Sequence, residues 1–323
     1  MVKNLYQVIK ITTPSRLHIT LIDMNASIGR VDGGIGLTLD SPVISISAER
    51  WDGIEITGCS EHSERMRKSA AALLPEGEGI SIKIEEDFPS HIGLGSGTQA
   101  SLAAGMAVNR LYELGLSVYD LAQKVGRGGT SGIGVAAFEN GGFILDGGHK
   151  FSDKKAFLPS AASKLPPAPI LLRKDFPAWD IVVAVPEQKG ASSKKEVKIF
   201  QEVCPVPLQE VQELSHVILM QLLPALVEED MASFGKSINS IQEIGFKKRE
   251  VELQPQSREL MQVMREGGAS GAGMSSFGPT VYALGEDAGE LEKIARKFLG
   301  ETGNVFITKA RNEGAKIKNL NNT

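Results

Sequence analysis

The glycines of this chain are gathered into short segments, and their positions restrict the possible folds more than any other feature of the sequence. They cluster at residues 29–36, 93–97, 126–134, 141–148 and 267–278. The stretch 206–244, by contrast, contains only Gly235. Glycine adopts positive φ at little cost and lets a ligand approach the backbone closely. We therefore expect several tight turns or ligand-binding loops between otherwise regular elements.

Length, charge and cysteine content exclude several classes of protein. A chain of 323 residues exceeds what one hydrophobic core usually serves, so two domains are expected. No apolar run approaches the ~20 residues of a membrane-spanning helix, and no signal-peptide core follows Met1. The net charge of -4 gives no global basic field for nucleic acid. Cys59 and Cys204 have the spacing of neither a disulfide framework nor a zinc site. We expect a cytoplasmic protein with no nucleic-acid or membrane partner.

The first half of the chain predicts strands followed by helices. Four segments alternate apolar and polar residues, as half-buried antiparallel strands do: 7–13, 43–50, 54–57 and 80–86. Asp52 and Gly53 predict a hairpin turn between the second and third of these. One helix is predicted after the glycines at 93–97, and another from Ser117, whose hydroxyl can cap it.

The second half predicts a linker and then a mixed α+β domain. Residues 151–178 contain five prolines without periodicity, which indicates the linker, and we place the domain boundary between residues 165 and 166. The predicted order beyond it is a strand at 180–186, helices at 206–228, 230–245 and 256–266, a strand at 280–284, a helix at 288–299 and a strand at 305–309. This order favours a ferredoxin-like arrangement.

A glycine-rich loop leads from a predicted strand into an alanine-rich helix. It runs from Pro89 to Ala100 and contains three glycines with Ser96 and Thr98 at the junction. The N-terminus of a helix has free N–H groups and partial positive charge, and glycine lets phosphate oxygens reach them. An ordinary glycine-rich entry to a helix is the alternative, but the two hydroxyls favour anion binding.

Three segments resemble motifs of the galactokinase, homoserine kinase, mevalonate kinase and phosphomevalonate kinase (GHMP) superfamily. Residues 89–100 resemble its phosphate-binding motif, residues 13–18 its N-terminal motif, and residues 271–284 its C-terminal glycine motif. The resemblance implies an α+β fold of two domains. The first would be a ribosomal S5 domain 2-like domain with a left-handed βαβ unit, the second would be ferredoxin-like, and the site would lie between them.

The chain departs from the kinase pattern at one position. These kinases commonly have a Ser-Gly-x-Asp segment whose aspartate helps to activate the substrate hydroxyl, whereas this chain has Gly134 there. Glycine cannot accept a proton, which weakens the kinase interpretation. Asp146 or Glu139 could substitute for the missing carboxylate.

Residues 13–36 resemble most closely the branch of the superfamily that is not made of kinases, the β-ribofuranosylaminobenzene 5'-phosphate synthases. Residues 194–200 and 241–248 also resemble that branch. The resemblance implies condensation of 5-phosphoribosyl-1-diphosphate with 4-aminobenzoate and release of CO₂ and diphosphate, in methanopterin biosynthesis. It also implies an archaeal or one-carbon-metabolising source, a homodimer, and Mg²⁺ accompanying the diphosphate. A small-molecule kinase using ATP and a non-catalytic sugar-phosphate sensor are the alternatives.

Charged residues in that segment are the candidates for catalysis. We predict that Asp23 stabilises the cation that forms at the sugar or helps to position magnesium, and that Arg30 pairs with diphosphate or with the benzoate carboxylate. Exposed salt bridges of small value are the alternative. No residues are predicted to hold a metal ion. The residues predicted to bind substrate are Arg16, His18, Asp32, Gly93, Gly95, Ser96, Gly97, Thr98, Ser131, Gly132, Gly271 and Gly273.

Overall fold

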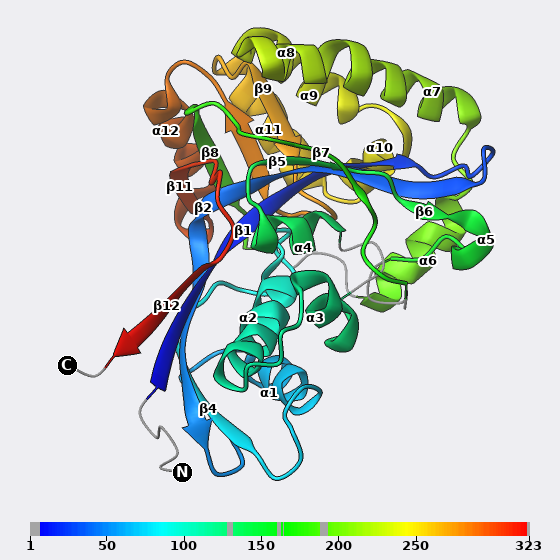
Figure 1. Cartoon of the computed structure of the whole chain (residues 1–323). Coiled ribbons are helices and arrows are strands. Elements are labelled where there is room, and N and C mark those ends of the chain that lie inside the picture. Colours follow the sequence, from blue (N-terminus) through cyan, green and yellow to red (C-terminus); the bar gives the residue numbers. More distant parts are fainter. Residues whose placement is uncertain (1–6, 128–131, 160–162, 164, 188–192, 322–323) are drawn as a thin grey trace.

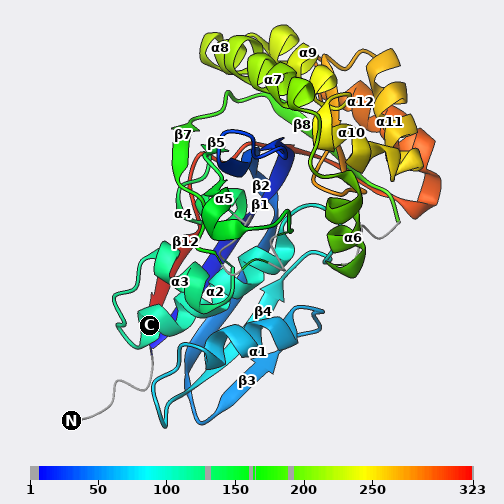
Figure 2. The same cartoon turned by 90° about the vertical axis from the view of Figure 1, so that its right-hand side faces the viewer.

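The structure, a computed structural model, has two sheets, each covered by helices (Figure 1). It describes residues 7–127, 132–159, 163, 165–187 and 193–321. The first sheet and helices α1–α4 form one end of the molecule, and helices α7–α12 gather around the second sheet at the other end (Figure 2). Within the described parts of the chain, no helix is long and apolar enough to cross a membrane.

The first sheet has eight strands and is covered by the N-terminal helices. Its strands are β1 (Gln7–Asp23), β2 (Arg30–Trp51), β3 (Ile54–Thr57), β4 (Gly79–Glu86), β5 (Phe143–Asp146), β6 (His149–Lys150), β7 (Ile170–Lys174) and β12 (Lys316–Asn321). The helices of this part are α1 (Ser63–Ala71), α2 (Ser96–Leu111), α3 (Val118–Lys124), α4 (Gly132–Glu139) and α5 (Phe151–Lys154).

Strands β1 and β2 form a long antiparallel pair at the centre of this sheet. Their register runs from Ile9 opposite Ala48 to Asp23 opposite Asp32. Alternate side chains of β1, such as Ile11 and Leu17, are fully buried because they face the core. Helices α2 and α4 pack on β1 and β2. The pair therefore extends from the N-terminal core to the second domain.

Two predictions for this region are wrong. Strand β3 is parallel to β4, not antiparallel, and helix α1 connects the two strands. The turn at Asp52 and Gly53 does not make a hairpin, since β4 lies between β2 and β3 in the sheet. A turn signal predicts a reversal of direction, but which strand occupies the neighbouring position depends on tertiary packing.

The helices α2 and α3 begin as the sequence predicts. Helix α2 is rich in alanine and almost entirely buried, which lets α1 pack closely against it. A β-carbon on Gly105 would lie 3.1 Å from Leu73 Cδ1, so only a small residue fits there. Ser117 caps α3 by accepting a hydrogen bond from the Asp120 N–H, and the Asp120 carboxylate accepts one from the Ser117 N–H in return. The predicted cap is confirmed.

The second sheet is antiparallel with the order β11-β8-β10-β9. Its strands are β8 (Asp180–Val185), β9 (Gly271–Met274), β10 (Val281–Leu284) and β11 (Asn304–Lys309). The helical elements around it are α6 (Ser193–Val203), α7 (Leu208–Val217), the π-helix η2 (Ile218–Leu222), α8 (Leu223–Glu228), α9 (Met231–Ile241), α10 (Gly245–Glu252), α11 (Pro255–Glu266), α12 (Ala288–Leu299) and the 3₁₀ helix η3 (Gly300–Thr302).

Both faces of the second sheet are buried. Val182 and Ala184 of β8 join the core that contains residues of α11 and α12, whereas Ile181 and Val183 join the core that contains residues of α7–α9. Because both faces are covered, β8 reads as a continuous apolar run instead of an alternating one. The predicted α+β class with a ferredoxin-like second domain is confirmed.

The stretch 151–178, predicted to be the linker, contains regular structure. Helix α5 lies within this stretch, and β7 pairs with β5 at the edge of the first sheet. Prolines are frequent in this stretch, but the sequence between Pro169 and Pro177 is long enough for a short edge strand. The domain boundary between residues 165 and 166 stays a prediction; β7 and β12, which follow it in the chain, pair with strands of the first sheet.

Candidate functional site

The three motif segments meet at the carbonyl oxygen of Gly93. Arg16 Nη1 donates a hydrogen bond to this oxygen at 2.5 Å, and Ser275 Oγ donates one at 2.7 Å. The same Ser275 hydroxyl accepts a hydrogen bond from the backbone N–H of His18 at 3.0 Å. Segments that lie more than 70 and 250 residues apart in the chain are thus joined at one point, as the motif order predicts.

Backbone contacts strengthen this junction and make glycine necessary in it. The N–H of Ser276 donates to His18 O at 2.8 Å, and Thr280 Oγ1 donates to Ile92 O. Gly93 has a φ of +93°, and a β-carbon on it would lie only 2.5 Å from the carbonyl oxygen of Ser275. A side chain at this position would therefore separate the two glycine loops.

The N-terminus of α2 lies beside an arginine. Gly95, with a φ of +85°, precedes the first residue of α2 and provides no side-chain cap. A β-carbon on Gly95 would lie 3.2 Å from Cγ, Nε and Cζ of Arg16. Burial lowers the pKa of Arg16 to about 10, which leaves the guanidinium charged at neutral pH. Free N–H groups and a fixed positive charge together suit an anion such as phosphate.

His18 contributes a neutral imidazole to the same region. Burial lowers the pKa of His18 well below its ordinary value, and the positive charges of Arg16 and Lys247 lower it further. Its Nδ1 is buried and has no hydrogen-bond partner among the described residues. An uncharged imidazole can donate from one nitrogen and accept at the other.

Lys247 of α10 holds the C-terminal glycine loop in place. Its ammonium donates to the carbonyl oxygens of Met274 and Ser276, at 3.3 and 3.0 Å, and lies 2.5 Å from Glu250 Oε2. Both charged side chains are almost completely buried. In the sequence, residues 241–248 stand out only for their resemblance to the synthase branch. Lys247 itself could not be identified from the sequence, because one lysine on a charged helix gives no sign that it is buried.

Ser96, Thr98, Gly97 and Gly132 lie on the helices next to the glycine loop. Ser96 and Thr98 belong to the first turn of α2 and are buried, and Gly97 lies between them. Gly132 is the first residue of α4, and Ser131 lies outside the described residues. The substrate contacts proposed for these residues stay predictions.

The position of the missing kinase aspartate is packed against α2. A β-carbon on Gly134 would lie 3.2 Å from Thr98 Cγ2, and the carbonyl of Gly134 accepts a hydrogen bond from Gln99 Nε2. Helix α4 thus approaches α2 closely at the point where a kinase would have its carboxylate.

Asp23 lies at the other end of β1. Seven residues separate it from Arg16, or up to about 23 Å along an extended strand. Its Oδ1 accepts hydrogen bonds from the N–H groups of Asn25 and Ala26, at 2.8 and 2.9 Å. In this structure, Asp23 closes the turn that follows β1.

Arg30 contacts the loop between β5 and β6. Its Nε and Nη2 donate to the carbonyl oxygens of Gly147 and Gly148, both at 2.9 Å. The Gly148 N–H in turn donates to Asp146 Oδ1 at 2.9 Å. The structure brings Arg30 to a glycine turn, but not to the glycines at 93–97. Its predicted role in catalysis stays a prediction.

Asp32 is part of a buried charged network. Its carboxylate lies 2.6 and 2.7 Å from the Lys154 ammonium and 2.8 Å from His149 Nδ1, and all three side chains are buried. His149 Nε2 lies 3.0 Å from the carbonyl oxygen of Pro166. These contacts leave no sign of a ligand at Asp32, whose substrate-binding role stays a prediction. The sequence could not reveal this network, because Asp32 and Lys154 are 122 residues apart.

Asp146 is a buried carboxylic acid next to His18. Burial raises its pKa to about 7, although the Gly148 N–H acts in the opposite direction. A β-carbon on Gly34 would lie 3.3 Å from both Asp146 Oδ2 and His18 Nε2. One on Gly132 would lie 2.9 Å from Asp146 Oδ2. Two glycines thus allow this carboxyl group to approach β2 and α4.

Gly271 and Gly273 have close contacts within the protein. A β-carbon on Gly271 would lie 2.5 Å from Gly235 Cα, and one on Gly273 would lie 2.5 Å from Tyr282 Oη. Both residues belong to β9, and the loop that meets Gly93 follows them. Their role in binding substrate stays a prediction.

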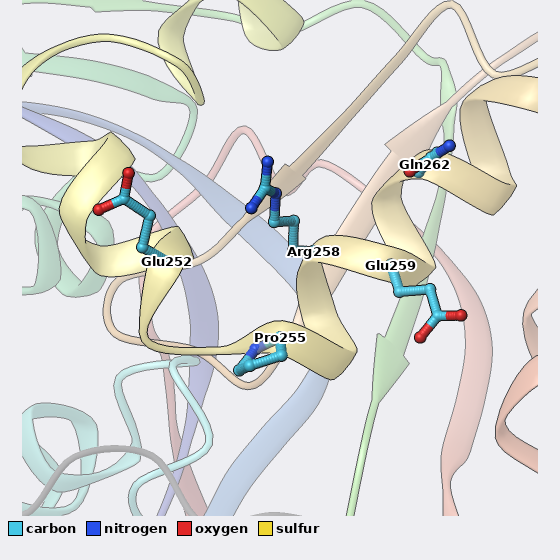
Figure 3. A pocket seen from close by; sticks show the side chains of 5 residues that line it. All are labelled: Glu252, Pro255, Arg258, Glu259 and Gln262. Atoms are coloured by element: carbon cyan, nitrogen blue, oxygen red, sulfur yellow. The ribbon is translucent and has the colours of Figure 1, made fainter.

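A surface pocket lies on α10 and α11, apart from the predicted site residues (Figure 3). It is lined by Glu252, Pro255, Arg258, Glu259 and Gln262. The charged side chains around it are spread over the helices in the view and do not converge on one point. The junction at Gly93 therefore remains the candidate site.

Comparisons with known proteins identify the family. Residues 63–142 match the GHMP kinases N terminal domain, and residues 222–305 match the GHMP kinases C terminal domain. A beta-ribofuranosylphenol 5'-phosphate synthase of Archaeoglobus fulgidus is 49% identical over 96% of this chain and 99% of the relative. The protein of the same name from Methanocaldococcus jannaschii is 45% identical over 95% and 99%, respectively.

Solved structures of kinases share the fold. A homoserine kinase from Cytophaga hutchinsonii has a TM-score of 0.70 with 18% identity, and the match covers 98% of this chain and 99% of that one. Mevalonate kinase of L. major, solved with R-mevalonate, also has a TM-score of 0.70, with 16% identity and coverage of 94% and 96%. At these identities the likeness concerns the fold.

Proposed function

This chain belongs to the GHMP kinase family and, within it, to the group of beta-ribofuranosylphenol 5'-phosphate synthases, and from that membership we propose that it is a decarboxylating phosphoribosyl transferase. The donor is 5-phosphoribosyl-1-diphosphate and the acceptor is a benzoate with an electron-donating group para to its carboxylate. The observation that carries the proposal is the near full-length identity to these synthases, and the cradle formed by Gly93, Gly95 and Arg16 supports it.

The acceptor is either 4-hydroxybenzoate or 4-aminobenzoate. The resemblance of residues 13–36 suggested the amine, whereas the relatives' name contains a phenol and favours the hydroxyl compound. Either group pushes electrons toward the ring carbon that bears the carboxylate. The chemistry at that carbon is therefore the same, and direct comparison of the two acceptors decides between them.

In the proposed reaction one carbon–carbon bond forms, and two single bonds break, one in the donor and one in the acceptor. The ring carbon that bears the carboxylate forms a bond to C1 of the ribose while the bond from C1 to the diphosphate oxygen breaks. The carbon–carbon bond to the carboxylate then breaks, CO₂ leaves, and its electron pair restores the aromatic ring. No base is needed to remove a ring proton, which is compatible with a glycine at position 134.

Residues of this chain would stabilise the charges that develop. The free N–H groups at the start of α2 and the guanidinium of Arg16 would hold phosphate oxygens. Diphosphate departs more easily when donors that are already oriented compensate its charge. Asp23 is the last residue of β1 and Arg30 is the first residue of β2, and their proposed roles are left to experiment.

The Mg²⁺ expected with diphosphate stays part of this proposal. Among the residues that the structure describes, no cluster of three His, Cys, Asp or Glu side chains is placed to hold a metal ion. The charged side chain beside Gly95 is the cation Arg16, which suits a phosphate oxygen and does not suit a metal ion. When bound with diphosphate, Mg²⁺ would neutralise part of its charge.

The experiment is to incubate the protein with phosphoribosyl diphosphate and each acceptor labelled in its carboxyl group. We expect labelled CO₂ and diphosphate in equal amounts, and more turnover with 4-hydroxybenzoate than with 4-aminobenzoate. ATP with homoserine, mevalonate or galactose is the comparison, and we expect no phosphate transfer because Gly134 provides no carboxylate. Saturable ATP turnover would favour a kinase, and donor binding without CO₂ release would favour a sensor.

A further inference from the structure

Two arginines from separate elements converge on Gly97 in the first turn of α2. A β-carbon on Gly97 would lie 3.1 Å from Arg127 Nη2 and 3.2 and 3.3 Å from Cζ and Nη1 of Arg65. Arg65 belongs to α1, and Arg127 follows α3. Figure 2 shows α1 and α3 on either side of α2, and both helices contact it. Both guanidinium groups therefore lie over the same part of the helix N-terminus.

Within the part of the chain that the structure describes, no acidic side chain pairs with either of these arginines. Among the described residues, neither the Arg65 nor the Arg127 guanidinium has a hydrogen-bond or ion-pair partner. Burial lowers the pKa of Arg65, which shows that its charge is partly removed from water. Two cations beside the positive end of a helix repel each other and the helix dipole. Such an arrangement is stabilised when an anion binds between them.

Arg67, two residues after Arg65 in α1, has the contacts of an ordinary surface arginine. Its guanidinium donates to the carbonyl oxygen of Ile54 and lies 4.0 Å from Glu64 on the protein surface. Among the residues that the structure describes, Arg65 makes no such contact, and its guanidinium lies near Gly97 of α2. The difference between these two arginines of one helix indicates that Arg65 is placed for a ligand.

We propose that Arg65 and Arg127 bind a phosphate group of the donor at Gly97, two residues from the glycine that Arg16 contacts. This inference rests on the proposed function. Arg16 lies over Gly95, and the Arg65–Arg127 pair lies over Gly97, so the loop has a cation over each of two glycines. A guanidinium presents two parallel N–H groups that match two phosphate oxygens. The ligand chemistry is a phosphate group, either of the diphosphate or at the 5-position of the ribose.

Calorimetry on the full chain tests this proposal, with inorganic diphosphate and ribose 5-phosphate as separate probes. We expect Arg65→Gln and Arg127→Gln each to weaken binding of one of the two probes by about tenfold or more, since each removes a charge-assisted contact. The probe that is affected identifies which phosphate occupies the site. Arg67→Gln is the matched control and should bind both probes within about twofold of the wild type.

A second variant guards against loss of folding. Arg65→Lys keeps the positive charge but loses the planar pair of donors, so it should fold and bind the affected probe with intermediate affinity. Wild-type affinity for both probes in Arg65→Gln and Arg127→Gln would overturn the proposal. If the wild type binds diphosphate but releases no CO₂ from either labelled benzoate, the anion site stands and the proposed transferase fails.

Discussion

Replacing Lys154 with methionine should destabilise the protein in a way that depends on pH. The Lys154 ammonium lies within 2.7 Å of both carboxylate oxygens of Asp32, and the two side chains are 1% and 3% exposed. Methionine has a similar length but no charge. Removing one partner of a buried ion pair typically costs about 3–5 kcal/mol, because the other charge stays buried without compensation.

His149 can replace part of the lost charge at low pH. Burial lowers the pKa of His149, but the hydrogen bonds to Asp32 and to the Pro166 carbonyl, together with the charge of Asp32, raise it overall above its ordinary value. Lys154 acts against this rise, so its removal should raise the His149 pKa further. Stabilisation from a raised histidine pKa is present below about 6.5 and is lost as the pH rises through the folded-state pKa.

The magnitude follows from these two effects. At pH 9, with His149 neutral, Lys154→Met should lose about 3–5 kcal/mol of unfolding free energy. At pH 6, His149 is protonated. Each additional unit by which its pKa rises in Lys154→Met then adds about 1.4 kcal/mol to the unfolding free energy of the variant. The variant should therefore be destabilised less at pH 6 than at pH 9, by at least about 1 kcal/mol.

Urea unfolding at pH 6 and pH 9 measures the effect. Lys155→Met is the control, because Lys155 is the exposed neighbour in the sequence. It should change the unfolding free energy by less than about 0.5 kcal/mol at either pH. An equal loss for Lys154→Met at both pH values would refute the compensation by His149, and a loss below about 1 kcal/mol at pH 9 would refute the buried pair itself.

Four further substitutions test other parts of the site. Burial raises the pKa of Asp146 to about 7, so the folded carboxyl keeps its proton while the unfolded one ionises. Asp146 should therefore contribute a loss of about 3 kcal/mol of stability between pH 4 and pH 7, and urea titrations of Asp146→Asn should lack this contribution. Gly95→Val places a side chain at a φ of +85° against Arg16, and calorimetry should show weaker binding of phosphoribosyl diphosphate in a folded protein. Asp23→Asn and Arg30→Gln should each lower turnover by ~10²-fold if they act on the transition state, with near-native thermal midpoints; native turnover in both would remove them from the site.

The sequence predicted the motifs themselves because each has its own local signature, and the resemblance placed the site between the two domains. Glycines with hydroxyls at a strand–helix transition mark a helix N-terminus, and the order of the motifs follows a known family. The contacts of Arg16 and Ser275 with Gly93 confirm that these segments meet. The extents of α3 and α12 were also predictable, since caps and helical periodicity depend on neighbouring residues.

Contacts between residues that are far apart in the sequence could not be predicted from local sequence patterns. Nothing near Arg65 distinguishes it from Arg67, because both lie on a polar helix and only the packing of α1 against α2 directs one of them to Gly97. The same holds for Lys154, whose burial depends on Asp32 in a distant strand. The order of β3 and β4 was missed for the same reason, since local alternation does not specify neighbours.

The charged end of the β1–β2 pair and the glycine cradle are connected through the protein, even though the cradle contacts β1 near its middle, at Arg16. Arg30 holds the carbonyls of Gly147 and Gly148, and the Gly148 N–H holds Asp146. Asp146 lies opposite Gly34 in the sheet and close to His18. The backbone N–H of His18 donates to the Ser275 hydroxyl, which in turn donates to the carbonyl oxygen of Gly93. Loss of the Arg30 side chain would release the turn that positions Asp146. A large effect of Arg30 on turnover would therefore be compatible with an indirect role, in which the residue orients the buried carboxyl group beside the cradle.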